Sequence, residues 1–115
     1  MADSMDLIKA IYDDKEAEIH GRKYVLLKMK HRARLQIFAF FTGIREQLEG
    51  GSMEFMGSPA WEGIEKKICQ HVTFDGDLLD KVPDHFDKYP EDYIFFATTM
   101  LGAMSYPFLS GSLTA

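Results

Sequence analysis

The stretch YPEDYIFFATTMLGAMSYP, residues 89–107, decides the fold class of this chain. A proline at the first position of a helix, followed by Glu91 and Asp92, is a typical helix start, because acids are favourable at the positive end of the helix dipole. We predict that this helix ends at residue 105 or 106, because Pro107 cannot continue it. Residues 107–115 are then predicted to form a loose C-terminal tail.

The predicted helix is apolar on more than one side. One stripe has helical spacing and comprises Tyr93, Ala97, Met100, Leu101 and Met104. Three further apolar residues face elsewhere, namely Ile94, Phe95 and Phe96. The uncharged run that begins at Tyr93 is long enough to span a bilayer. Its many Thr, Ser and Gly residues, and the absence of a basic residue at its end, favour a buried helix over a membrane span.

A second helix is predicted over residues 31–49, and Gly50 and Gly51 provide its C-terminal stop. One stripe on this helix comprises Ile37, Phe41, Ile44 and Leu48. Three more apolar residues extend around its first half, namely Leu35, Phe38 and Phe40. A helix that is apolar nearly all round needs packing partners on more than one side.

A small β-hairpin is predicted near residues 16–28, because Gly21 supplies the positive φ that a tight turn requires. Its candidate core contacts are Ile19, Tyr24 and Leu26. A two-stranded hairpin is marginally stable alone, so it must pack on helices. The fold class is therefore mainly α, a single small helical domain over residues 1–115 with an N-terminal β-hairpin.

Shorter elements complete the prediction. A helix capped by Asp3 or Ser4 runs through Tyr12, and residues 50–58 form a loop. Ser58 and Pro59 provide the cap and first-turn proline of a helix through about residue 71. Asp75 and Gly76 make a turn, and a short helix interrupted at Pro83 is predicted over residues 77–86.

Charge is distributed unevenly along the chain. The net charge is −5, yet the segment between Glu18 and Glu46 contains seven Lys and Arg residues and no acid. The flanking stretches are acidic, most densely over residues 75–92. The N-terminus lacks the basic-then-apolar layout of a signal peptide, so we expect a cytoplasmic protein.

The residues that carry chemistry are not arranged as in a known kind of site. Four histidines, at positions 20, 31, 71 and 85, lack the close helical spacing of metal-binding pairs. Cys69 is the only cysteine, and a lone cysteine on an apolar stripe is usually a core residue. The acidic stretch lacks the pattern of a calcium loop. We therefore predict no catalytic residue, no metal and no cofactor.

The basic segment 28–34 supports an alternative, a small DNA-binding regulator that contacts phosphates through this segment. The negative net charge argues against nucleic acid as the partner. Positive charge in the first turn of a helix is mildly unfavourable. We therefore expect the basic face to pair with the acidic segment of the same chain or of a neighbouring copy.

The apolar excess of the two long helices, together with seven Met residues, favours a homo-oligomeric adaptor or a protein that binds clients. The alternative is a densely packed core. The residues predicted to contact a client or a second copy are Phe38, Phe41, Met53, Phe55, Phe95 and Met100.

Three segments together resemble the tail assembly chaperones of long-tailed bacteriophages. They are the hairpin EAEIHGRKYVLLKM, the helix HRARLQIFAFFTGI, which opens basic and turns apolar, and the closing segment PEDYIFFATTMLGAMSYPFL. The resemblance implies a mainly helical, non-catalytic protein of the host cell cytoplasm. Such a protein coats the long tape measure protein and helps recruit tail-tube subunits. It also implies a longer, frameshifted product, with which the ending at residues 110–115 is compatible.

Overall fold

The computed structural model describes the backbone of residues 2–114 and the side chains of residues 6–109. The fold is mainly α, as predicted, with a small antiparallel sheet on the N-terminal side. The helices of this part of the chain are α1 (Ala2–Asp14), α2 (His31–Glu49), α3 (Pro59–Cys69), α4 (His85–Lys88) and α5 (Tyr93–Thr114), with short 3₁₀ turns η1 (Glu54–Gly57), η2 (Leu79–Lys81) and η3 (Pro90–Asp92). The strands are β1 (Glu16–Ile19), β2 (Arg22–Leu26), β3 (Val72–Phe74) and β4 (Asp77–Leu78).

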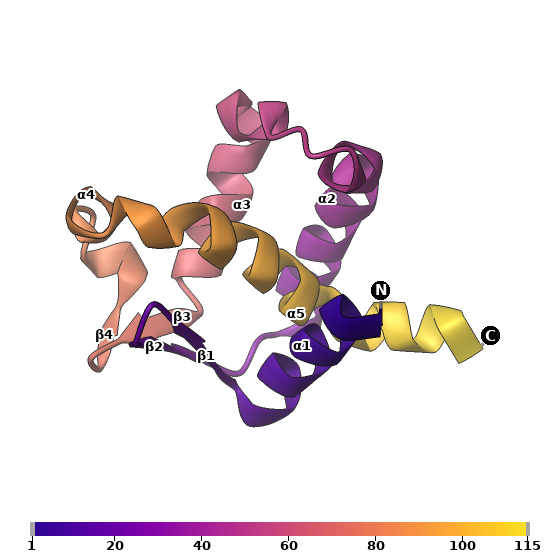
Figure 1. The fold of residues 1–115 in the computed structure, drawn as a ribbon, viewed down its shortest axis with the longest axis horizontal. Coiled ribbons are helices and arrows are strands. Elements are labelled where there is room, and N and C mark those ends of the chain that lie inside the picture. Colours follow the sequence, from indigo (N-terminus) through magenta and orange to yellow (C-terminus); the bar gives the residue numbers. More distant parts are fainter. Residues whose placement is uncertain (1, 115) are drawn as a thin grey trace.

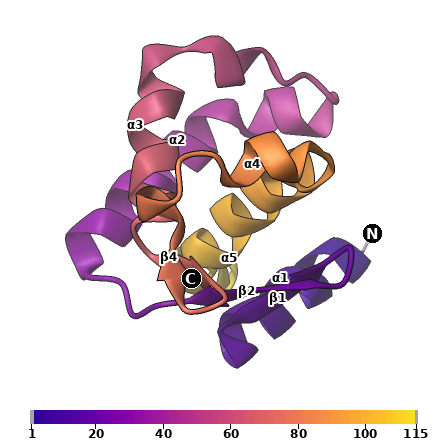
Figure 2. The ribbon, with the colours of Figure 1, turned by 90° about the vertical axis from the view of Figure 1, so that its left-hand side faces the viewer.

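Helix α5 is the centre of the fold. Figure 2 shows it between α2 and α3 on one side and the sheet with α1 on the other, and it contacts α1, α2 and α3. Every residue from 96 to 105 is buried except Thr98. Most of the apolar excess of α5 is therefore core. This favours the dense-core alternative for most of the helix; among its side chains up to residue 109, only those of the first turn are large, apolar and exposed.

The C-terminal end of α5 differs from the prediction. The helix continues without a break through Pro107 to residue 114 (Figure 1). The predicted helix end at residue 105 or 106, and the loose tail over residues 107–115, are therefore wrong as far as residue 114. Residue 115 lies outside the described residues.

Packing on both sides of Pro107 accounts for this continuation. The ring of Tyr106 lies 5.4 Å from the ring of Tyr12 on α1, and the ring of Phe108 lies 5.0 Å from that of Phe38 on α2. A proline inside a helix costs about 3 kcal/mol. Tyr106 and Phe108 are half-buried, so each contributes part of the roughly 1.5–3 kcal/mol of a fully buried aromatic side chain, and the two together offset much of that cost.

The predicted hairpin is confirmed as β1 and β2. Ile19 pairs with Arg22 across a two-residue turn in which His20 and Gly21 both have positive φ, 52° and 80°. This is the geometry of a tight hairpin turn, which matches the right-handed twist of the strands. The side chains of Ile19, Tyr24 and Leu26 alternate into the core at 3%, 0% and 8% exposure, as predicted.

The sheet contains two strands that the sequence did not predict. The Asp75–Gly76 turn was predicted correctly, but it joins β3 to β4 in a second hairpin. β3 pairs antiparallel with β2, so the order of the sheet is β1-β2-β3-β4. The helix predicted over residues 77–86 is wrong, since this segment contains β4, η2 and only the start of α4. Strands of three and two residues are too short to show a periodic pattern.

The other helices follow the prediction closely. α2 has the predicted bounds, and the side chains of Ile37 and Ile44 on its inner stripe are buried. α3 begins at the predicted cap, where the backbone N–H of Trp61 donates to Ser58 Oγ at 3.2 Å. The predicted loop over residues 50–58 is irregular except for η1.

Helix α1 approaches α5 at Gly102. A Cβ atom at this position would lie 2.6 Å from Ile8 Cδ1 and 3.1 Å from Ile8 Cγ1, closer than van der Waals contact allows. At Gly43 in α2, a Cβ atom would meet nothing within 4 Å. We therefore expect Gly43→Ala to stabilise the protein by up to about 1 kcal/mol through helix propensity.

Gly102→Ala is expected to destabilise the protein by about 1–2 kcal/mol, because Ile8 and α1 must move away. Urea unfolding of both variants measures the two effects. Equal stabilisation by the two substitutions would contradict the close packing of α1 on α5.

Candidate protein-binding site

The six residues predicted to contact a client differ in exposure. Phe95 is 43% exposed, and three others, Phe38, Phe41 and Met53, are half-buried. Phe55 and Met100 are core residues, with 5% and 0% exposure. A partner cannot reach these two side chains in the folded chain, so the structure assigns them to the core instead.

The structure brings two of the six residues together. Phe95 and Met53 line one groove, whereas Phe38 packs on Phe108 and Phe41 lies beside Arg45. We call this hollow the Phe95 groove; it has a volume of about 410 Å³. It is lined by Leu7, Ile8, Leu48, Met53, Phe95, Thr98 and Thr99, from α1, the end of α2, the following loop and α5.

The end of α2 positions Met53. Gly51 has a φ of +80°, its N–H donates to the Leu48 carbonyl at 3.0 Å, and the N–H of Ser52 donates to the Gln47 carbonyl at 2.7 Å. This pair of bonds is a Schellman motif, which ends the helix and turns the chain sharply. The turn brings the loop back, and Met53 lines the same groove as Phe95.

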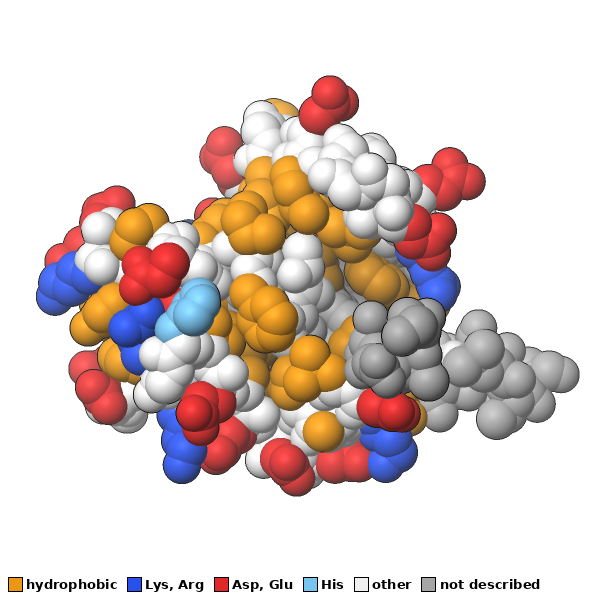
Figure 3. All heavy atoms as spheres, in the orientation of Figure 1, with side chains coloured by type: hydrophobic (Ala, Val, Ile, Leu, Met, Phe, Trp, Pro, Cys, Tyr) orange, Lys and Arg blue, Asp and Glu red, His pale blue; other side chains and the backbone are white. Residues whose placement is uncertain are grey.

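The Phe95 groove is uncharged. None of its lining side chains is ionisable, and the Thr98 hydroxyl already donates to the Ile94 carbonyl of its own helix at 2.9 Å. Figure 3 shows apolar side chains gathered over this face of the molecule, with acidic side chains along its lower edge. Such a surface offers apolar contact to a partner, and the flexible Met53 side chain allows it to adapt.

Part of the groove was not foreseen from the sequence. The sequence predicts a helix that contains Leu7 and Ile8, but it does not indicate which element these two side chains face. In the structure Leu7 lines the groove with Phe95, and its apolar side chain is 46% exposed. The sequence signal for this contact was that the first helix has more apolar residues than one narrow stripe needs, which indicates an apolar surface beyond its core face.

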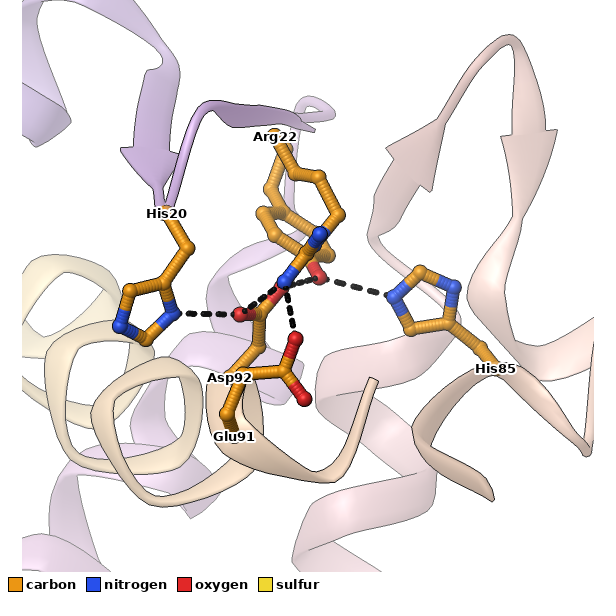
Figure 4. Close-up of polar contacts among 6 residues, drawn as sticks. His20, Arg22, His85, Glu91 and Asp92 are labelled. Carbon is orange, nitrogen blue, oxygen red and sulfur yellow. Dashed lines mark hydrogen bonds and ion pairs between the residues drawn. The ribbon is translucent and has the colours of Figure 1, made fainter. Parts of the chain in front are cut away.

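A buried polar cluster lies at the turn of the β1–β2 hairpin, around Asp92 (Figure 4). Asp92 has 0% exposure. Its Oδ1 accepts from His20 Nδ1 at 2.7 Å and from Arg22 Nη2 at 2.9 Å. Its Oδ2 accepts from Arg22 Nε at 2.7 Å and from the Tyr24 hydroxyl at 2.7 Å. These four bonds use the full accepting capacity of the carboxylate.

The cluster joins the hairpin to the start of α5. The Arg22 guanidinium also pairs with Glu91 at 2.6 Å and lies 4.1 Å from the centre of the Tyr89 ring. The sequence predicted Glu91 and Asp92 only as acids at a helix start and gave no partner for them. Because every oxygen of Asp92 is occupied by a neighbouring side chain, we interpret the cluster as a structural clamp.

The cluster shifts the pKa values of its members. Hydrogen bonds from Arg22 hold the pKa of Asp92 well below its usual range. Burial and the neighbouring Asp92 carboxylate raise the pKa of Tyr24. The Tyr24 hydroxyl donates its one proton to Asp92, so its oxygen accepts from Nε2–H of His85 at 2.8 Å. Burial lowers the pKa of His85 and keeps its ring neutral.

These shifts predict how stability depends on pH. The pKa of His85 is below 6.5 in the folded chain, so on acidification the unfolded chain binds a proton first and stability falls below about pH 6.5. The charged groups that act on His85 are Asp92, Arg22, Asp84 and Lys88. Asp92, with its lowered pKa, adds a further loss below about pH 4.

Urea midpoints measured from pH 8 to pH 3 test this prediction. In His85→Phe, we expect the loss that begins near pH 6.5 to shrink while the loss below about pH 4 remains. Unchanged pH dependence in this variant would show that His85 does not carry the first loss.

The remaining candidates for chemistry do not form a reactive site. Burial raises the pKa of the Cys69 thiol to about 12, so it is a poor nucleophile at neutral pH. Within residues 6–109, no group of three or more His, Cys, Asp or Glu side chains is placed to hold a metal ion. The helices of the described chain include none long and apolar enough to cross a membrane.

Comparisons with models of known protein families, with curated proteins and with solved structures find no match for this chain.

Proposed function

We propose that this protein is a non-catalytic tail assembly chaperone, which holds an apolar segment of a tape measure protein in the Phe95 groove and helps recruit tail-tube subunits. The observation that carries the proposal is the uncharged groove itself, which has Leu7 and Phe95 46% and 43% exposed beside each other. The layout of the sequence, which resembles that chaperone family, supplies the identity of the client.

The groove suits one face of a helix. Residues of α1, the end of α2, the loop after α2 and α5 line the groove together. An amphipathic helix binds in such a groove through apolar side chains on one face, while its polar face remains in water. A long helical client offers many such faces. Several copies of the protein can therefore cover it before the tail tube encloses it.

Co-expression tests the proposal. The chain is produced with overlapping fragments of the tape measure protein that the same genome encodes. We expect helical fragments with an apolar face to remain soluble and to co-purify with the chain, because the groove covers their apolar side chains. Thr98→Glu, which places a charge in the groove, is expected to abolish this effect. A chain that retains no fragment, or a Thr98→Glu variant that retains the same fragments, would contradict the proposal.

A further inference from the structure

A hollow with a cationic rim is lined by residues of α1, β2, α2, α5 and the loops between them, and it shares no residue with the Phe95 groove. Its volume is about 450 Å³, and its rim carries Lys15, Lys28 and Arg34. Its apolar lining includes Leu26, Leu27 and Met29, and none of its lining residues is acidic. We call this the cationic hollow. A rim of three cations is unexpected in a chain whose net charge is −5.

Two of these cations are held in place by uncharged groups. Arg34 Nη1 donates to the Met104 carbonyl at 2.8 Å, and Lys15 Nζ donates to the Tyr12 carbonyl at 2.8 Å. Among the described side chains, no carboxylate oxygen lies within 4.0 Å of the charged nitrogens of Lys15, Lys28 or Arg34. The predicted pairing of the basic segment with the acidic segment of the same chain is therefore not formed here. A carboxylate from outside would complete the rim.

An acidic hollow lies between α1 and β1. Its volume is about 300 Å³, its rim carries Asp14, Glu16 and Glu18, and none of its lining residues is basic. Glu16 lies 3.7 Å from the exposed Lys23, whereas Asp14 and Glu18 have no cation within 4.0 Å among the described side chains. This second hollow therefore has the opposite charge to the first.

Both hollows also present exposed apolar side chains. Leu7 and Phe95 line the acidic hollow, and Leu27, which is 40% exposed, lines the cationic hollow. Burial of Leu27 at a contact is favourable, while the charged rims fix its register and disfavour wrong partners. A nucleic acid is a poorer fit for the cationic hollow, because the ring of Tyr12 is already covered by Lys15 and Tyr106 and is not free to stack on a base.

We propose that the acidic hollow of one copy binds the cationic hollow of the next copy, so that the protein associates head to tail. Glu18 and Asp14 of one copy meet Lys28 and Arg34 of the other. The two hollows share no lining residue, so a pair of bound copies leaves one hollow of each kind free. A contact of this kind builds a ring or an open filament, and not a closed dimer.

Charge reversal on exposed residues tests this contact. The full chain, Lys28→Glu and Glu18→Lys are compared by sedimentation equilibrium at low and high salt. The wild-type chain is expected to associate at low salt and to weaken at least about tenfold at high salt, because salt screens the rim charges. Each single variant is expected to be monomeric, since like charges then face each other. Lys81→Glu, an exposed lysine outside both hollows, is the control and is expected to associate like the wild type.

The mixture of the two variants provides the decisive result. Each variant alone carries one reversed charge, but the two substitutions together exchange the charges of the proposed Glu18–Lys28 pair, so an equimolar mixture is expected to associate although each variant alone is monomeric. A wild-type chain that remains monomeric at every concentration, or a mixture that remains monomeric, overturns the proposal. Lys28→Glu is still expected to bind the tape measure fragments, so loss of self-association is distinguishable from loss of client binding.

Discussion

Replacing Asp92 with Asn is expected to lower the free energy of unfolding by about 3 kcal/mol or more, because it leaves buried donors without their charged acceptor. Asp92 is fully buried and accepts four hydrogen bonds, two of them from Arg22. The amide of Asn has one accepting oxygen, and its N–H₂ group would face other donors. The substitution would therefore remove hydrogen bonds that join the hairpin to the start of α5.

Glu91→Gln is the matched control for this substitution. Glu91 pairs with the same guanidinium at 2.6 Å, but its side chain is 53% exposed. An exposed pair contributes less than about 1 kcal/mol. Urea unfolding of both variants at neutral pH measures the difference. Equal costs for the two substitutions would show that burial of Asp92 does not determine the strength of the clamp.

Phe95→Glu is expected to weaken client binding by about a hundredfold or more, because hot-spot aromatic residues contribute at least about 2–4 kcal/mol to binding. The substitution removes the exposed ring and places a charge in an uncharged groove. Phe95 is 43% exposed in the free protein, so the folded chain should tolerate the change. Calorimetric titration with a tape measure fragment that co-purifies measures the affinity.

Ile94→Glu is the control for this variant. Ile94 precedes Phe95 in α5 and is 47% exposed, but it does not line the Phe95 groove. We expect Ile94→Glu to bind the fragment with nearly the affinity of the wild type. Equal weakening by both substitutions would indicate a general effect of charge or folding at the start of α5, and the groove would no longer explain binding.

Local patterns predicted much of the fold. The His20–Gly21 turn, the cap at Ser58 and the glycine stop of α2 each follow from residues close together in sequence, and the structure confirms them. The end of α5 could not be predicted in this way. Pro107 is a strong local stop signal, and contacts of its neighbours with Tyr12 and Phe38 overcome it.

The candidate site was less predictable for the same reason. Periodicity shows that α5 is apolar on several sides, but it does not show which sides the rest of the chain covers. The structure places Met100 in the core and leaves Phe95 exposed, although both were predicted contacts. The hydrogen-bond donors to the Asp92 carboxylate lie about 70 positions away in the sequence, for example Arg22. A local sequence pattern cannot predict such a long-range pairing.

Photo-crosslinking from position 95 tests the central claim most directly. A photoreactive benzoyl-phenylalanine replaces Phe95, and in a parallel variant it replaces Val25, an exposed residue that does not line the groove. Each variant is co-expressed with the tape measure protein, irradiated and analysed by mass spectrometry. We predict crosslinks to apolar helical segments of the tape measure protein from position 95, and far fewer from position 25. Crosslinks of equal yield from both positions, or none to the tape measure protein from position 95, would contradict the assignment of the Phe95 groove as the client site.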